Sequence, residues 1–300
     1  MLKKIVPLDI YEALNKVNIS HLNEIRIRSE KPIVLSIDGQ RFFLGHQGIT
    51  SNLKDSIIAS KTMVEDIIFR ASECSIYSVN EQIKKGFIVT DKGLRIGIGG
   101  DYIEENGVAR TMSNYSSVNI RIPHEVKNCC LKVFDLMLDN QQVQSTLILS
   151  PPGAGKTTFL RDFIYQLSER NYAYNVLILD ERGEIDLGSQ GGVGNFADKI
   201  CFARKKVGFE NGIRSLSPNI IVTDELGQAE DIDAVLYAVN CGVSIIASTH
   251  CESIDQFLNK QSFEKIIRDK VFKRYVVLSM RQGPGTIEGV YNENFSRVRS

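Results

Sequence analysis

The chain has 300 residues, of which 43% are hydrophobic and 24% charged, and its 36 lysines and arginines balance 36 aspartates and glutamates. This is the composition of an ordinary soluble globular protein, and the zero net charge argues against nucleic acid as an obligatory partner. No apolar run approaches the roughly eighteen residues of a membrane-spanning helix, and Asp9 and Glu12 follow the start too early for a signal peptide. We therefore expect a cytoplasmic protein that reaches a membrane only through partners.

The first 125 residues predict a smaller α+β domain. Residues 9–17 have the spacing of an amphipathic helix, and Glu24–Arg28 (EIRIR) alternates charged and apolar residues like a half-buried strand. Asp38-Gly39 lies between two apolar runs and predicts a type I′ hairpin. A second β region extends to Pro123.

One further helix is predicted in this part, over residues 61–73. Four apolar residues mark the face that it should bury: Met63, Ile67, Ile68 and Phe69. Their spacing follows the helical repeat of 3.6 residues.

The remaining residues, 126–300, predict an α/β domain with a mostly parallel sheet. A helical pattern opens it, with five apolar positions: Val126, Cys130, Val133, Phe134 and Met137. Four continuous apolar runs follow, STLILS, NVLILDE, NIIVTDE and VSIIAST, separated by loops or helical patterns. Strands of this kind are typical of a parallel sheet that is covered on both faces.

The stretch LILSPPGAGKTTFL (Leu147–Leu160) predicts a phosphate-binding loop between a strand and a helix. Two glycines allow backbone N–H groups to face phosphates, a lysine supplies positive charge, and the helix N-terminus adds its dipole. Serine replaces the usual first glycine, where the residue mainly closes the turn. We expect ATP to be bound by Ser150, Pro151, Pro152, Gly153, Ala154, Gly155, Lys156, Thr157 and Thr158.

Asp224-Glu225 ends the apolar run NIIVTDE and provides an acidic site. In a parallel sheet this strand end lies at the same edge as the phosphate loop. We expect Asp224 to hold Mg²⁺ together with the Thr157 hydroxyl, and Glu225 to orient the water that attacks ATP.

Two other strand ends carry polar residues. LILDERGEID brings Glu181 and Glu184, which are alternative catalytic acids, and SIIASTH ends in His250, a candidate sensor of the γ-phosphate. The charged run Ala203–Arg214 is interpreted as a solvated surface loop.

The order of these motifs resembles the type II/IV secretion ATPase superfamily, whose members carry a Walker A loop, an acidic box, a Walker B strand and a histidine box in this order. The stage III sporulation protein AA family is the most similar. The phrases that carry the resemblance run from Asn23 to His250: NEIRIRSEKPIVL, SIYSVNEQIKKGFIVTDKGLRIGIGG, PPGAGKTTFLRD, LDERGEI, IIVTDELG and STH.

The resemblance implies a RecA-like core and an ATPase of the mother cell that acts on a channel complex linking mother cell and forespore. It implies membrane-protein partners and assembly into a homo-oligomeric ring. It also implies that arginines of the N-terminal domain reach the bound phosphates, and by position these are Arg95 and Arg121. The chain departs from the superfamily at Thr223–Glu225, where secretion ATPases usually read Gly-Glu.

Two other functions stay open from the sequence alone. A RecA-type nucleic-acid motor would share the core but would need a basic or aromatic loop for its strand. A nucleotide-gated scaffold would bind ATP and turn it over very slowly.

Overall fold

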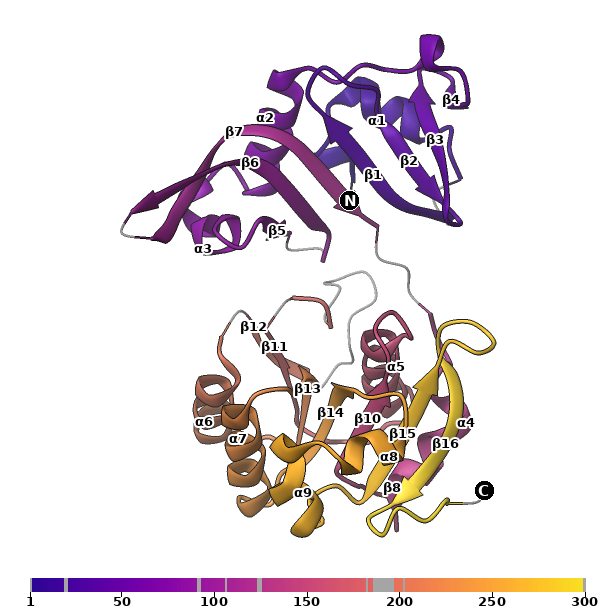
Figure 1. Ribbon diagram of the computed structural model, residues 1–300, viewed down its shortest axis with the longest axis vertical. Coiled ribbons are helices and arrows are strands. Elements are labelled where there is room, and N and C mark those ends of the chain that lie inside the picture. The colour runs from indigo at the N-terminus through magenta and orange to yellow at the C-terminus, as the bar shows by residue number, and fades with distance from the viewer. Residues whose placement is uncertain are drawn as a thin grey trace. The chain divides into compact units, whose positions relative to one another are not determined.

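The computed structural model describes residues 2–18, 21–90, 93–105, 107–122, 126–181, 183–185, 197–201 and 203–298. The chain divides into two compact units, Met1–His124 and Glu125–Ser300. Each unit has its own sheet and its own buried core (Figure 1).

The first unit is built on an antiparallel sheet with the strand order β4-β3-β2-β1-β7-β6-β5. Its strands are β1 (Leu22–Arg28), β2 (Val34–Ile37), β3 (Gln40–Gly45), β4 (Gly48–Thr50), β5 (Phe87–Val89), β6 (Arg95–Glu105) and β7 (Val108–Arg121). Its helices are α1 (Leu8–Leu14), α2 (Lys61–Ala71) and α3 (Asn80–Ile83), with 3-10 turns η1 (Leu2–Lys4), η3 (Leu53–Asp55) and η4 (Ile76–Val79). Apolar residues of α1 and α2 share one core with alternate residues of the strands.

The predicted hairpin is confirmed, because Ile37 pairs with Gln40 and leaves Asp38-Gly39 as a two-residue turn. Both turn residues have positive φ, 48° and 80°, as a type I′ turn requires. The predicted burial of Phe69 on α2 is wrong, since its side chain is 46% exposed, and Val64 is buried instead. Val64 lies one helical turn before Ile68 and therefore shares its face, whereas Phe69 is rotated by about 100°.

The second unit contains the predicted parallel sheet, with the order β12-β11-β13-β14-β10-β15-β16 and an antiparallel β16 at one edge. Its strands are β10 (Thr146–Ser150), β11 (Val176–Asp180), β12 (Ala197–Cys201), β13 (Ile220–Glu225), β14 (Ser244–His250), β15 (Arg274–Ser279) and β16 (Thr286–Asn292), besides a small hairpin of β8 (Leu138–Asp139) and β9 (Gln142–Val143). Alternate residues of β10 enter different cores: Leu147 and Leu149 belong to one, and Ile148 belongs to the other. The sheet is therefore covered on both faces, as predicted.

The helices of this unit are α4 (Leu131–Phe134), α5 (Lys156–Glu169), α6 (Lys205–Leu216), α7 (Ala229–Asn240), α8 (Ile254–Leu258) and α9 (Glu264–Arg268), with 3-10 turns η5 (Asp135–Met137) and η6 (Gln261–Phe263). The helix predicted after residue 125 is short, because α4 changes to 3-10 geometry at Asp135, and Val126 is 51% exposed.

The prediction of a surface loop over Ala203–Arg214 is wrong. Most of this run forms α6, which packs on β11 through two glycines. A Cβ on Gly212 would lie 2.2 Å from Cδ2 of Leu177, and one on Gly208 would lie 3.1 Å from Cδ2 of Leu179. The small residues thus let the helix approach the strand closely, and its first residue, Lys205, is buried.

Candidate functional site

The phosphate loop joins β10 to α5 in the conformation that the glycines allow. Gly153 and Gly155 have positive φ, 76° and 89°, and Gly155 is the N-cap of α5, which begins at Lys156. Ala154 between them is fully buried. Ser150 closes the turn, because its hydroxyl donates a hydrogen bond to the carbonyl of Pro151 (2.9 Å). The loop therefore presents backbone N–H groups and the positive end of the helix to an anion.

The turn between β15 and β16 supports this loop from outside. The N–H of Gly285 donates a hydrogen bond to the carbonyl of Ala154 (3.0 Å). A Cβ on Gly155 would lie 3.3 Å from the same nitrogen. The approach of the two backbones is one reason why residue 155 is a glycine.

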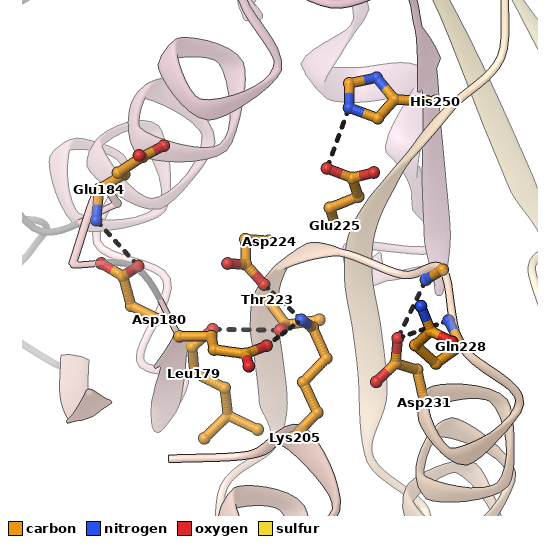
Figure 2. Close-up of polar contacts among 12 residues, drawn as sticks. Leu179, Asp180, Glu184, Lys205, Thr223, Asp224, Glu225, Gln228, Asp231 and His250 are labelled. Atoms are coloured by element: carbon orange, nitrogen blue, oxygen red, sulfur yellow. Dashed lines mark hydrogen bonds and ion pairs between the residues drawn. The ribbon is translucent and has the colours of Figure 1, made fainter. Parts of the chain in front are cut away.

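Lys156, His250 and Glu225 form a chain of contacts across the carboxyl ends of adjacent strands. The Nζ of Lys156 lies 2.6 Å from Nδ1 of His250, and Nε2 of His250 lies 3.0 Å from Oε2 of Glu225 (Figure 2 shows the latter contact). An ammonium group only donates, so Nδ1 accepts and the ring proton lies on Nε2, from where it is donated to Glu225. The predicted sensor histidine thus contacts both the loop lysine and the predicted water-orienting acid.

A second set of contacts lies beside the first. Lys205 Nζ is 2.8 Å from Oδ1 of Asp224 (Figure 2) and 3.0 Å from Oε2 of Glu181. The contact with Asp224 is an ion pair, and the carboxylate of Glu181 accepts a hydrogen bond from the same ammonium group. The side chain of Lys205 is 6% exposed and that of Asp224 is 14% exposed. Lys205 is therefore a buried cation between two acidic strand ends.

The pKa values in this set follow from burial and charge. Burial raises the pKa of Asp224, and Asp180 and Glu181 add to the rise, while Lys205 opposes it. Burial alone would lower the pKa of Lys205, but attraction to Asp224 and Glu181 outweighs it and holds that pKa above the ordinary value. The lysine therefore stays protonated at neutral pH.

Asp180, at the end of β11, binds backbone groups of its own segment. Its two carboxylate oxygens accept hydrogen bonds from the backbone N–H of Glu184 (2.9 Å, Figure 2) and of Ile185 (2.7 Å). The guanidinium of Arg161 on α5 donates to the carbonyls of the same two residues. The bonds from Arg161 thus connect Glu184 and Ile185 to α5.

The residues predicted to bind Mg²⁺ have the oxygen atoms that this ion prefers. The Thr157 hydroxyl, in the first turn of α5, and the Asp224 carboxylate are hard oxygen ligands of the type that Mg²⁺ prefers. Within the part of the chain that the structure describes, no three His, Cys, Asp or Glu side chains gather as a metal site on their own. Thr158 lies next to Thr157 in the same turn.

Arg95 and Arg121 lie in the first unit as direct neighbours on β6 and β7. The guanidinium of Arg95 lies over the ring of Phe87, 4.1 Å from its centroid, and Nε of Arg121 is 3.5 Å from Oε1 of Glu24. The two arginines that sequence reasoning selected are thus brought together on one sheet.

Lys205 is the residue of this site that sequence reasoning missed. It lies between Arg204 and Lys206, so the sequence does not distinguish it from its charged neighbours. Its pairing with Asp224 depends on the packing of α6 against β11. The two glycines of α6, Gly208 and Gly212, were the signal that this helix lies close to a strand.

The parallel sheet, the phosphate loop and the polar strand ends define a RecA-like fold, and solved structures agree. The pilus retraction motor PilT, solved with bound ADP, superposes with a TM-score of 0.63 at 16% identity, covering 90% of this chain and 78% of its own. The ATPase DotB of Legionella pneumophila gives 0.59 at 15% identity, covering 91% and 76%.

The sequence comparisons are more specific. The family model described as "Sporulation stage III, protein AA" matches residues 2–298. The stage III sporulation protein AA of Bacillus subtilis (strain 168) is 33% identical over 283 residues, which cover 91% of this chain and 87% of that protein. The chain belongs to the sporulation stage III, protein AA family, as the motif order predicted.

Proposed function

We propose that the chain binds ATP at the phosphate loop, hydrolyses it, and acts as a motor or gate of a channel complex between mother cell and forespore. The observation that carries this proposal is the contact chain Lys156–His250–Glu225, which links the phosphate loop to a carboxylate. A structural turn needs no such chain, whereas a site for ATP hydrolysis needs a cation at the phosphates and a carboxylate near the attacking water.

The loop residues bind the phosphates. Backbone N–H groups from Gly153 to Lys156 and the Lys156 ammonium neutralise the β- and γ-phosphates, and Thr157 with Asp224 holds Mg²⁺. When bound, Mg²⁺ supplies further positive charge to the phosphate oxygens. Ser150, the two prolines, Ala154 and Thr158 shape the loop around these groups.

Glu225 is the proposed base. Its carboxylate accepts a proton from water as the water oxygen bonds to the γ-phosphorus, and the bond from that phosphorus to the bridging oxygen of ADP breaks, which gives ADP and phosphate. Glu181 and Glu184 are the alternative acids, but Glu181 is paired with Lys205. His250 orients Glu225 through Nε2–H, and it loses the contact at Nδ1 when Lys156 turns to phosphate. It can therefore report whether nucleotide is bound.

The partners and the location are proposed from the family. Among the described residues, no helix is long and apolar enough to span a membrane. We place the protein in the cytoplasm of the mother cell, at the membrane through membrane-protein partners, as a homo-oligomeric ring. In this assembly Arg95 and Arg121 complete the nucleotide site.

A nucleotide-gated scaffold with very slow turnover is the second candidate. It is supported by the same contact chain, because Lys156 is engaged by His250 and must be released before its ammonium group can reach phosphate. A measured turnover below that of ordinary ATPases, together with tight ATP binding, would select this candidate. Stimulation of turnover by single-stranded DNA would select the RecA-type nucleic-acid motor.

The test of the phosphate site is Lys156→Ala, with Lys206→Ala as the matched control because Lys206 is an exposed lysine of α6. We expect calorimetric titration with ATP to show a loss of affinity of about 100-fold or more for Lys156→Ala, since a charge-assisted contact contributes up to ~3 kcal/mol. The control should bind like the wild type. Equal binding by Lys156→Ala would refute the site.

A further inference from the structure

Lys205 joins the ends of two adjacent strands that the sequence shows as separate acidic motifs. β11 ends at Asp180 with Glu181 after it, and β13, its neighbour in the sheet, ends with Asp224-Glu225. The single ammonium group of Lys205 contacts one acid from each end, at 3.0 and 2.8 Å. It reaches them from the first residue of α6, on a third segment of the chain.

More negative than positive charge lies around the ammonium group of Lys205. Asp224 and Glu181 touch it, and the carboxylate of Asp180 is close enough to raise the pKa of Asp224. A buried carboxylate without a counter-ion costs several kcal/mol. The ammonium group of Lys205 therefore neutralises carboxylates that a divalent ion could otherwise neutralise.

We propose that Lys205 is a built-in counter-ion that occupies Asp224 and prevents a free divalent cation from binding there without nucleotide. A metal ion on Oδ1 of Asp224 would lie beside an ammonium group that is 2.8 Å from the same oxygen. The repulsion between these cations opposes metal binding, and the negative charge of nucleotide phosphates reverses the balance. Asp224 would then accept Mg²⁺ only together with ATP. The part that concerns nucleotide rests on the proposed function, whereas the counter-ion role does not.

This makes Lys205 a positioning residue, which acts through Asp224 and Glu181. Its neighbour Lys206 provides a control on the same helix, because that side chain is exposed. Lys205→Met keeps the aliphatic stem and removes the charge. Lys205→Arg keeps the charge.

The main experiment measures Mn²⁺ binding to the nucleotide-free protein by electron paramagnetic resonance, with Mn²⁺ as a probe for Mg²⁺. Lys205→Met should bind Mn²⁺ at least about tenfold more tightly than the wild type, because the competing charge is gone. Lys206→Met and Lys205→Arg should resemble the wild type. Equal affinity in Lys205→Met and the wild type would overturn the inference.

A second measurement covers the case in which Lys205→Met folds poorly. Thermal unfolding is compared for Lys205→Met, Asp224→Asn and the double variant, which together form a double-mutant cycle. If Lys205 neutralises Asp224, the double variant is more stable than Lys205→Met alone. A double variant that is no more stable than Lys205→Met contradicts the counter-ion role.

The coupling between nucleotide and metal gives a third measurement that separates this inference from the proposed function. The affinity for a non-hydrolysable ATP analogue is measured with Mg²⁺ and with EDTA, and the ratio of the two affinities is the coupling. It should be smaller in Lys205→Met than in the wild type, since metal no longer needs the phosphates. An unchanged ratio overturns the nucleotide part. Failure of the wild type to bind the analogue refutes the proposed function but leaves the Mn²⁺ result standing.

Discussion

The ends of β11 and β13 carry the same dipeptide, Asp-Glu, after an apolar strand, and the structure uses them differently. The aspartate of β11, Asp180, is 1% exposed, and its oxygens accept two backbone N–H groups. The aspartate of β13, Asp224, is paired with a lysine side chain, and Glu225 after it is paired with His250. One aspartate binds the backbone of its own segment, and the other forms an ion pair with a side chain from another segment.

The difference arises from the backbone at each strand end. After β11 the backbone N–H groups of Glu184 and Ile185 donate hydrogen bonds to Asp180. In β13 the register with β14 shifts between Val222 and Glu225, which is a bulge or irregularity. Bulges redirect side chains and are frequent next to functional sites. The same dipeptide at two strand ends therefore makes different contacts, because the local backbone differs.

The largest expected effect tests the two glutamates. Glu225→Gln should lower ATP turnover by about 10³-fold with little change in ATP binding, because a general base contributes about 10² to 10⁴ in rate. Glu181→Gln is the matched substitution at the other strand end and should lower turnover much less. Steady-state hydrolysis and calorimetric binding are measured for both. A reversed order would move the catalytic role to β11.

The next effect tests whether the two arginines of the first unit contribute to ATP turnover. Arg95→Ala and Arg121→Ala should each lower turnover by about 10²-fold, as removal of one donor to transition-state charge does, with a much smaller change in ATP affinity. An ATP analogue should also promote assembly, measured by light scattering. Arg110→Ala is a control on the same sheet, since Arg110 pairs with Glu105. Normal hydrolysis in both variants would remove these arginines from the site.

The third effect concerns stability and compares the two aspartates directly. Asp180→Asn should destabilise the protein by about 2 kcal/mol, because an amide nitrogen then faces a buried N–H that has lost its acceptor. Asp224→Asn should cost less stability, as Lys205 keeps Glu181, but it should weaken the dependence of turnover on Mg²⁺. Denaturant unfolding measures the first difference. Exposed Asp198→Asn is the control.

The smallest effect concerns another aspartate whose carboxylate, like that of Asp180, accepts hydrogen bonds from two backbone N–H groups. Asp162 on α5 accepts N–H groups from Asn128 and Cys130, both at 2.8 Å. Burial alone would raise its pKa, but these hydrogen bonds outweigh it, so the pKa lies below the ordinary value. A lowered folded-state pKa stabilises above the unfolded-state value, and this stability is lost as pH falls through the folded-state pKa.

We therefore expect Asp162→Asn to cost about 1 to 2 kcal/mol at pH 7. The difference from the wild type should shrink below about pH 4, where the carboxylate of the unfolded wild-type chain begins to be protonated. Urea unfolding at several pH values measures it. A constant difference across this range would contradict the assigned pKa direction.

Local patterns were sufficient to predict the core of the fold and the glycine-rich turn between β10 and α5. β10, β11, β13 and β14 are continuous apolar runs, so a parallel sheet followed from their order. β12 was not predicted, because its sequence ADKIC lies at the sheet edge with exposed Asp198 and Lys199 and has no apolar run. The pairing of Lys205 with Asp224 needs three segments to meet, and no periodicity in a single segment reports such a meeting.

The contact between Gly285 and Ala154 has a consequence for biosynthesis. The loop that contains Ala154 is synthesised well before the turn between β15 and β16 that supports it. A nascent chain can form β10 and α5 early, yet this support must wait until β15 and β16 have left the ribosome. Contacts between distant parts of a chain form late and slow folding. Until the turn at Gly285 has left the ribosome, the loop at Ala154 therefore lacks the backbone hydrogen bond that supports it.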